Sequence, residues 1–378
     1  MLFLLATAQG ASPWIELSLM GRDERLAQIW NQLSVSDGPV PSPMPVYRQI
    51  AARSGRMKDL MGLCATAPLP NPPDPLQNDP AFHQYLAGLK MAFRSLMATS
   101  AVEFYDGRAA VGTKMLRDGL QASYRMQSSS MLGGLSGIAL QSMVLAEVEK
   151  RLGRFSLTDL EGFAKTAKGW LADKPLYLQA IERDRATSLA SFDGWWRDPW
   201  PLLATNGMTP ETVAAIRRQW ETIPANAQAA EAGRIREKMD RDYRTLVDHF
   251  GAAESTWPKS DFAIAKGSEE GLASKLAPYL ILGRDVVVYD AVPKGWTQLR
   301  LLRLHALVRA FRWRQDRWPR SLSEAAGNEA FDPIANKPFT YGLEGGAYRL
   351  RSEGWPSLGP IELRYRSGAK GEGTEAGA

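Results

Sequence analysis

The spacing of apolar residues predicts a mostly helical chain. Between positions 82 and 104, apolar side chains recur at intervals of three and four residues and form one continuous stripe: Phe82, Leu86, Leu89, Phe93, Leu96, Met97, Ala101 and Phe104. This period is typical of an amphipathic α-helix. A Tyr105-Asp106-Gly107-Arg108 turn follows, and then a second helix from about 109 to 127. The pattern therefore predicts a helical hairpin.

Further helical segments follow this hairpin, and several carry start signals. Ser156 or Thr158 is placed to cap one helix, and Thr209-Pro210 is a good start for another. The hairpin resembles a single tetratricopeptide-like unit, but no second copy follows at a fixed period, so no repeat array is predicted. The expected helices cover residues 131–152, 156–172, 175–192, 210–222 and 224–249, with another from about 268.

Two segments of this helical part are less regular. Residues 192–201, FDGWWRDPWP, predict an aromatic loop. Residues 276–291 are ambiguous, because their valine run favours a strand while their helical surroundings favour a helix. We take the second segment as a helix.

The pattern changes after Pro293 and Gly295. A helix is expected over 297–315, and it ends before Pro319 because the residue preceding a proline avoids the helical region. Apolar residues then alternate with polar ones, which is typical of half-exposed strands. Three such runs are expected, with a hairpin loop at 344–346, and their apolar members are Phe339, Tyr341, Leu343, Tyr348, Leu350, Ile361, Leu363 and Tyr365.

The predicted fold class is therefore mainly α. We expect a multi-helix bundle of helical hairpins, followed by a small C-terminal α+β unit with a three-stranded antiparallel sheet. The expected division is a truncated signal or anchor remnant at 1–12, a helical body at 13–292, the α+β unit at 293–366, and a disordered tail at 367–378.

The first residues, MLFLLATAQGAS, resemble the back half of a signal peptide. Leu2 to Ala6 is apolar, and Ala6-Thr7-Ala8 has the small-x-small pattern of a cleavage site, although no positive region precedes it. We expect export to the cell envelope or periplasm; the alternative is a short N-terminus in a cytoplasmic protein. The uncharged stretch from Met131 to Ala146 is shorter than the ~20 residues that a membrane span needs, so it predicts a buried helix.

Charge and cysteine content narrow the classes of function. Cys64 is the single cysteine, which excludes an intramolecular disulfide and any multi-cysteine metal site. The net charge is +5, and residues 297–320 hold seven arginines against one acid, Asp316. On a helical projection, a subset of them falls roughly on one side: Arg300, Arg303, Arg314 and Arg317. These four are candidates for contact with an anionic membrane surface or an acidic partner; the alternative is a solvated helix, and nucleic acid is disfavoured because the charge is spread over several faces.

No catalytic residue, metal site or cofactor is predicted. The three histidines, His83, His249 and His305, lie in separate helices without ligand spacing. No nucleophile elbow, phosphate loop or dinucleotide fingerprint is present. Ser128-Ser129-Ser130 is better explained as a helix cap than as a nucleophile cluster.

The tryptophans of the aromatic loop are the remaining candidates for ligand binding. Trp195, Trp196 and Trp200 could stack on sugars or lie at a membrane interface. The alternative is that they fill the gap between helices.

The C-terminal segment carries a resemblance. RWRQDRWPRSL, FDPIANKPFTY and GGAYRLRSEG follow a helix in that order. This order resembles the C-terminal globular part of type II secretion pseudopilins, and it covers residues 293–366. The chain departs from that pattern because the N-terminal pilin helix is absent, Trp318 stands where tyrosine is usual, and Glu353 is the one acid of the loop where that family binds calcium. The whole layout is similar to uncharacterised envelope proteins of planctomycete-type bacteria, whose N-terminal anchor would account for the signal-like start.

These observations favour a non-enzymatic, envelope-associated scaffold or protein-interaction protein with protein partners, linked to a secretion or pilus-like system by the resemblance. One alternative is a hydrolase that acts on an envelope polymer, with its site near residues 192–200. Another is a cytosolic helical adaptor. The sequence leaves the oligomeric state open.

Overall fold

The computed structural model describes residues 12–32, 43–71, 80–173, 175–205, 209–257, 272, 276, 286–355 and 358–363. Within these residues the predicted fold class is confirmed, with helices throughout and one small three-stranded antiparallel sheet near the C-terminus. The signal-like segment before Ser12 and the tail from 367 lie outside the described residues. Of the expected helix from about 268, only Leu272 and Leu276 are described before α15, and both are helical.

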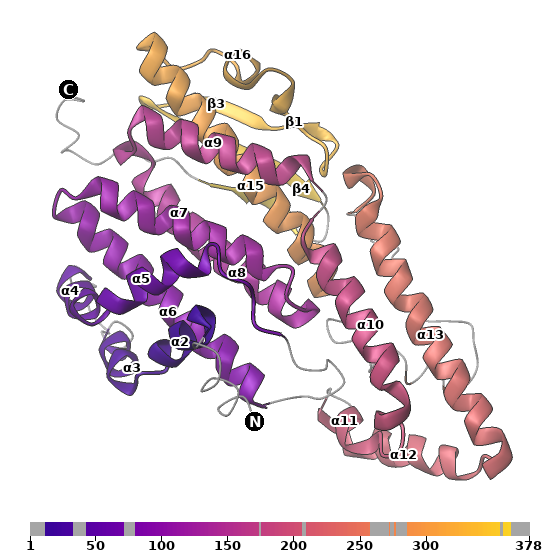
Figure 1. Cartoon of the computed structure of the whole chain (residues 1–378). Coiled ribbons are helices and arrows are strands. Elements are labelled where there is room, and N and C mark those ends of the chain that lie inside the picture. Colours follow the sequence, from indigo (N-terminus) through magenta and orange to yellow (C-terminus); the bar gives the residue numbers. More distant parts are fainter. Residues whose placement is uncertain are drawn as a thin grey trace.

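Short N-terminal helices pack against the predicted hairpin (Figure 1). They are α2 (Pro13–Gly21), α3 (Glu24–Asn31), α4 (Met44–Arg53) and α5 (Gly55–Cys64). The hairpin itself consists of α6 (Pro80–Tyr105) and α7 (Ala109–Met126), joined by a turn in which Gly107 has a φ of 79°. The predicted hairpin and its turn are therefore confirmed.

Two helices extend this bundle. Helix α8 (Met131–Arg151) continues into a 3₁₀ turn, η1 (Leu152–Arg154), and α9 (Leu157–Ala172) follows. Ser156 caps α9 through a capping box with Asp159. Met131–Arg154 has the length and apolar composition to cross a membrane, but 61% of its most apolar window is buried among the neighbouring elements. This helical segment is thus longer than the uncharged stretch from Met131 to Ala146. Its burial agrees with the prediction of a buried helix.

A pair of long helices stands beside the bundle and forms an arm (Figure 1). We define the arm as α10 (Tyr177–Trp195), α11 (Trp200–Thr205), α12 (Pro210–Glu221) and α13 (Ala225–Gly251). Helices α10 and α13 pack along each other, while α11 and α12 form the far tip. Thr209 caps α12 with Pro210 in the first turn, as predicted. The 3₁₀ turn η2 (Glu254–Thr256) follows α13 at the base of the arm.

The helix expected at 297–315 begins earlier than predicted. Helix α15 runs from Val286 to Gln315 with Pro293 inside it. The valine run is therefore helical, as we took it to be, whereas the start at 297 was wrong. A proline inside a helix costs about 3 kcal/mol or more, so other contacts must offset it. Gln141 of α8 donates to the backbone oxygen of Gly295 at 2.9 Å, and Trp355 donates to Asp290 at 2.9 Å, which holds the helix on both sides of the proline.

The remaining elements form the C-terminal unit. They are α16 (Leu322–Ala326), η3 (Gly327–Ala330), β1 (Phe331–Asp332), β2 (Lys337–Pro338), β3 (Thr340–Glu344), β4 (Ala347–Trp355) and β5 (Gly359–Glu362). Strands β3, β4 and β5 form the antiparallel sheet in that order. Gly345 and Gly346 have φ values of 57° and 84°, which fits a two-residue hairpin turn whose central positions both need positive φ. The third strand ends at Glu362, so its predicted continuation through Leu363 was wrong, and Tyr365 lies outside the described residues.

A buried carboxylate ties the Asp-Pro turn to the sheet. Asp332 is 1% exposed and accepts a hydrogen bond from the backbone N–H of Ile334 at 3.0 Å. Its other oxygen accepts from the hydroxyl of Ser352 in β4 at 2.5 Å. A buried charge is tolerated only when it is paired or well hydrogen-bonded. The turn is therefore specified by this carboxylate as well as by Pro333.

The sheet packs on α15 through a buried histidine. His305 has no exposed surface, and its Nδ1 lies 2.8 Å from the hydroxyl of Tyr348 in β4. Burial lowers the pKa of this imidazole to about 4, with a smaller lowering from nearby Arg309, while a backbone hydrogen bond and Glu362 oppose the change. His305 is consequently neutral at neutral pH in the folded protein.

Helices α2 and α6 cross at two glycines. A Cβ atom added to Gly88 would overlap the backbone oxygen of Ser18, and one added to Gly21 would overlap the backbone oxygen of Gly88. Ser18 also donates from its hydroxyl to the backbone oxygen of Tyr85 at 2.8 Å. Only glycine permits this closeness, because each backbone oxygen occupies the space of a side chain.

The glycine crossing leads to a first prediction. Gly88→Ala should lower the free energy of unfolding by about 1–3 kcal/mol, because the added methyl group overpacks a contact with rigid backbone. Urea unfolding followed by circular dichroism measures this change. Gly233→Ala is the matched control, because nothing lies within 4 Å of the added Cβ in the middle of α13. The control should raise stability by up to about 1 kcal/mol, through helix propensity. Equal effects of the two substitutions would contradict the crossing.

The buried histidine leads to a second prediction, on pH dependence. The folded pKa of about 4 lies below the ordinary value of 6.5, so the unfolded chain binds the proton more readily. The free energy of unfolding should therefore fall as the pH drops from about 6.5 towards 4, with no further loss from this group below that range. Between pH 7 and pH 5 the loss should be roughly 2 kcal/mol greater in the natural chain than in His305→Gln, which keeps a hydrogen-bonding group but does not titrate. Parallel pH profiles for the two proteins would disprove this role of His305.

Candidate functional site

The predicted aromatic loop is shorter than expected. Trp195 is the last residue of α10 and Trp200 is the first of α11, so only the few residues between them are non-helical. The backbone N–H of Trp196 still donates to the carbonyl of Phe192 at 2.8 Å, which continues the helical turn. The prediction of a loop over 192–201 was wrong at both ends, since ring packing favours helix here over the local turn signals.

Two of the three tryptophans, Trp195 and Trp196, lie together at the tip of the arm, with ring centres 5.5 Å apart. Trp196 stacks on Phe192 with ring centres 5.4 Å apart and meets Trp220 of α12 edge-on at 5.0 Å. Trp195 lies 5.8 Å from the Phe192 ring. All three are partly buried, and much of their aromatic surface is used within the protein. The structure thus brings Trp195 and Trp196 into one cluster, whereas their predicted role in ligand binding stays a prediction.

Two members of this tip were missed in the sequence. Trp220 joins the cluster from α12, and Arg217 places its guanidinium 5.9 Å from the centre of the Trp200 ring. Their spacing of three residues on one amphipathic helix was a usable signal, because such residues share a face. The sequence around α12 did not indicate that this face of the helix packs against α10.

Each of the four predicted arginines has a carboxylate partner. Arg300 Nη2 lies 2.6 Å and 2.5 Å from the two carboxylate oxygens of Glu254, which also accepts from Trp296. Arg303 forms a two-bond pair with Glu329 and donates to the backbone oxygen of Ala164 at 2.6 Å. These two arginines connect η2, η3 and α9 to α15.

The other two arginines lie further along the chain and are more exposed. Arg314 pairs with Glu161 of α9, and Arg317 lies 2.5 Å from Glu324 of α16. The structure therefore brings Arg300 and Arg303 together and places Arg314 and Arg317 elsewhere. Contact of all four with an anionic surface stays a prediction; their ion pairs already supply a structural role for each.

Other titratable groups serve the core. Cys64 is fully buried, and burial raises the pKa of its thiol to about 12, so it stays protonated and inert. Ser130 caps α8 by accepting from the backbone N–H of Gly133 at 3.1 Å, in agreement with the predicted cap. His249 lies 3.0 Å from the backbone oxygen of Trp257, and burial lowers its pKa. Within the described ranges, no three His, Cys, Asp or Glu side chains gather as a metal site would require.

Two hollows of the described part of the chain are lined by charged side chains. The larger, of about 440 Å³, lies between α10 and α13 and is lined in part by Glu182 and Asp248. The smaller, of about 300 Å³, lies between α9, α15 and β1 and is lined by both Arg300 and Arg303.

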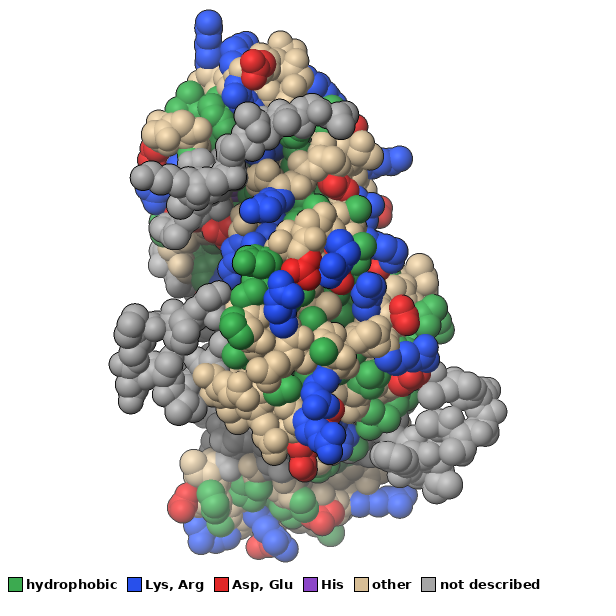
Figure 2. All heavy atoms as spheres, turned by 90° about the vertical axis from the view of Figure 1, so that its left-hand side faces the viewer, with side chains coloured by type: hydrophobic (Ala, Val, Ile, Leu, Met, Phe, Trp, Pro, Cys, Tyr) green, Lys and Arg blue, Asp and Glu red, His purple; other side chains and the backbone are tan. Residues whose placement is uncertain are grey.

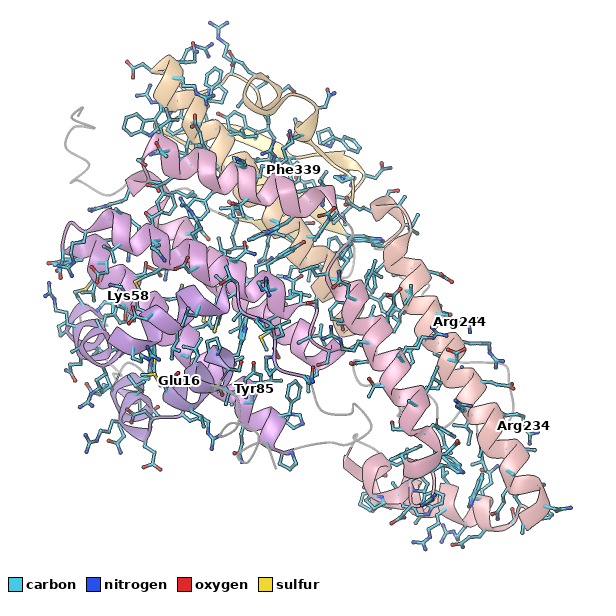
Figure 3. The ribbon with its side chains drawn as sticks, in the orientation of Figure 1. Glu16, Lys58, Tyr85, Arg234, Arg244 and Phe339 are labelled. Carbon is cyan, nitrogen blue, oxygen red and sulfur yellow. The ribbon has the colours of Figure 1, made fainter. Side chains whose placement is uncertain are left out.

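The charged surface elsewhere is mixed. Figure 2 shows basic and acidic side chains interspersed over the face it presents. Along α13, Arg234 and Arg244 (labelled in Figure 3) pair with Glu231 and Asp240 of the same helix. In both pairs the arginine is exposed while the carboxylate is largely covered, and each pair neutralises its own charge, so no strong field of one sign results on this helix.

No protein family, no curated protein and no solved structure matches the chain. The architecture therefore defines the class at the level of fold: a bundle of helices with a C-terminal unit that carries a three-stranded antiparallel sheet. The pseudopilin resemblance stays a prediction.

The arginine pairs lead to a third prediction. Arg303→Met should lower the free energy of unfolding by roughly 1–3 kcal/mol, because the buried Ala164 carbonyl loses its donor. Arg314→Met should change it by no more than about 0.5 kcal/mol, because Arg314 and Glu161 are 56% and 48% exposed and water replaces the contact. Urea unfolding of both variants tests the difference. A similar loss in the two proteins would show that Arg303 is no more structural than Arg314.

Proposed function

We propose that the protein is a non-enzymatic, envelope-associated scaffold or protein-interaction protein. The observation that carries this proposal is the arm, which extends from the helical bundle and bears an aromatic cluster at its tip (Figure 1). Tryptophan is enriched in the centres of protein interfaces because it offers a large apolar surface with little loss of side-chain freedom.

The arm is suited to hold a partner at a fixed position. Polar contacts join α10 to α13: the buried hydroxyl groups of Ser188 and Tyr243 lie 3.2 Å apart, and the half-buried pair of Arg185 and Asp240 is 2.6 Å apart. At the base of the arm, Glu254 binds Trp296 and Arg300 of α15. An arm that is packed along its length and anchored at its base loses little entropy when its tip binds.

The envelope location and the link to a secretion or pilus-like system rest on the sequence. The signal-like first residues support export, and the pseudopilin-like order of segments in 293–366 supports the link. A cytosolic helical adaptor remains the alternative if the chain is not exported.

A second candidate function is hydrolysis of an envelope polymer. It is favoured by the hollow of about 440 Å³ on the same arm, which Glu182 of α10 and Asp248 of α13 both line; this hollow does not include the residues 192–200 where the sequence placed the site. Polymer cleavage that Glu182→Gln and Asp248→Asn each abolish, while α-helical content is kept, would establish this function and overturn the scaffold.

A single experiment in cells tests the scaffold proposal. A photo-reactive amino acid replaces Arg218, an exposed residue of α12 at the tip, and the natively tagged protein is irradiated and fractionated. The matched control carries the same group at Arg53, an exposed residue of α4 on the opposite side of the molecule. We expect a membrane or periplasmic product, with a cross-link to one defined protein from position 218 and none from 53.

The outcomes separate the alternatives. Mass-spectrometric sequencing of the mature N-terminus shows whether the product is cleaved near Ala8. A soluble cytosolic product that starts at Met1, with a cross-link at 218, would replace the envelope scaffold by the cytosolic adaptor. If position 218 gives no cross-link in any fraction, the arm is not the element that binds a partner.

A further inference from the structure

The smaller hollow combines an apolar wall with a cationic edge. Its volume is about 300 Å³, and its apolar wall includes Leu171 of α9, Leu304 of α15 and Phe331 of β1. Phe331 is 45% exposed, which is unusual for so large an apolar side chain. Lys168 of α9 and the two arginines, Arg300 and Arg303, line the same space. We call this site the arginine hollow.

The charges around the arginine hollow leave one positive charge in excess. Glu254 offsets Arg300 and Glu329 offsets Arg303, whereas Lys168 is exposed and has no carboxylate partner among the described residues. A net charge of this size matches a ligand with a single negative charge. It does not match a phosphate dianion or a polyanion, which would require more uncompensated cations.

The arginines are held firmly enough to orient a ligand. Arg303 is 8% exposed, and its guanidinium is fixed by Glu329 and by the carbonyl of Ala164. Arg300 keeps one N–H group, Nη1, buried and without an acceptor in the described part of the chain. A donor of this kind carries an unfavourable desolvation term, which an acceptor placed within hydrogen-bond distance of Nη1 would remove.

Size and lining together define the ligand. Small-molecule sites begin at about 300 Å³ and are mostly apolar with a few placed polar groups, and this hollow lies at that lower limit. It has room for one branched or aromatic group beside one carboxylate. We propose that the arginine hollow binds an organic monocarboxylate that carries a single apolar group, either as a free molecule or as the C-terminal residue of a peptide. This site is separate from the tip of the arm and does not depend on the proposed function.

The test uses the purified full chain and titration calorimetry. The probe is N-acetyl-leucine, and its neutral amide is the matched control. We expect saturable binding of the acid and binding of the amide at least roughly tenfold weaker, as loss of a charge-assisted contact predicts. Inorganic phosphate, which lacks the apolar group, should bind more weakly than the acid. A hexapeptide that ends in a leucine carboxylate distinguishes the sources, because tighter binding of the peptide than of the free acid would indicate a C-terminus.

Substitutions at two exposed residues test the arginine hollow without risk to the fold. Lys168→Gln removes the excess charge, and Phe331→Ala removes the exposed apolar side chain at the edge of the hollow. Each substitution should lower the affinity for the acid roughly three- to tenfold. Arg317→Gln, an arginine of the same region that does not line the hollow, should leave binding unchanged. Equal binding of acid and amide, stronger binding of phosphate, no binding of the acid at about 10 mM, or binding that both hollow variants leave unaltered would each overturn the proposal.

Discussion

Helix α15 has neighbours on almost every side, and the rest of the structure depends on how its polar groups are paired there. It packs against α8 and α9 of the bundle and also against β4 and β5 of the C-terminal unit. Leu299, Leu301, Leu302 and Leu304 are all buried, so no single side of this stretch faces water. Polar groups on such a helix need partners inside the protein, because their burial without hydrogen bonds costs free energy.

Those partners come from different parts of the chain and therefore join them. Arg303 reaches α9 and η3, His305 reaches β4, and Asp290 reaches Trp355. Each of these hydrogen bonds joins two particular polar groups, and apolar side chains surround it. The C-terminal unit is thus not attached by a linker alone; it shares a buried helix with the bundle, and α15 runs without interruption through the expected division at 292/293.

The arm is built differently and has a different relation to the core. Its two long helices pack mainly on each other, and its tip closes with aromatic rings. Its base is held by η2 and α15. This arrangement places an aromatic cluster away from the bundle while the bundle supplies the anchorage, which is why the arm is the part of the molecule that we associate with a partner.

Much of the secondary structure followed from the sequence alone. The α6–α7 hairpin, the caps at Ser156 and Thr209, and a hairpin loop at 344–346 were predicted, because each depends on residues within a few positions of one another; the turn proved one residue shorter, since Glu344 belongs to β3. The tertiary structure decided where α15 begins, which tryptophans are helical, and which carboxylate each arginine meets. Gln141 and Trp355 hold α15 on the two sides of Pro293, and the arginine hollow exists because α9, α15 and β1 converge. Such contacts join residues far apart in the sequence, and no local pattern carries that information.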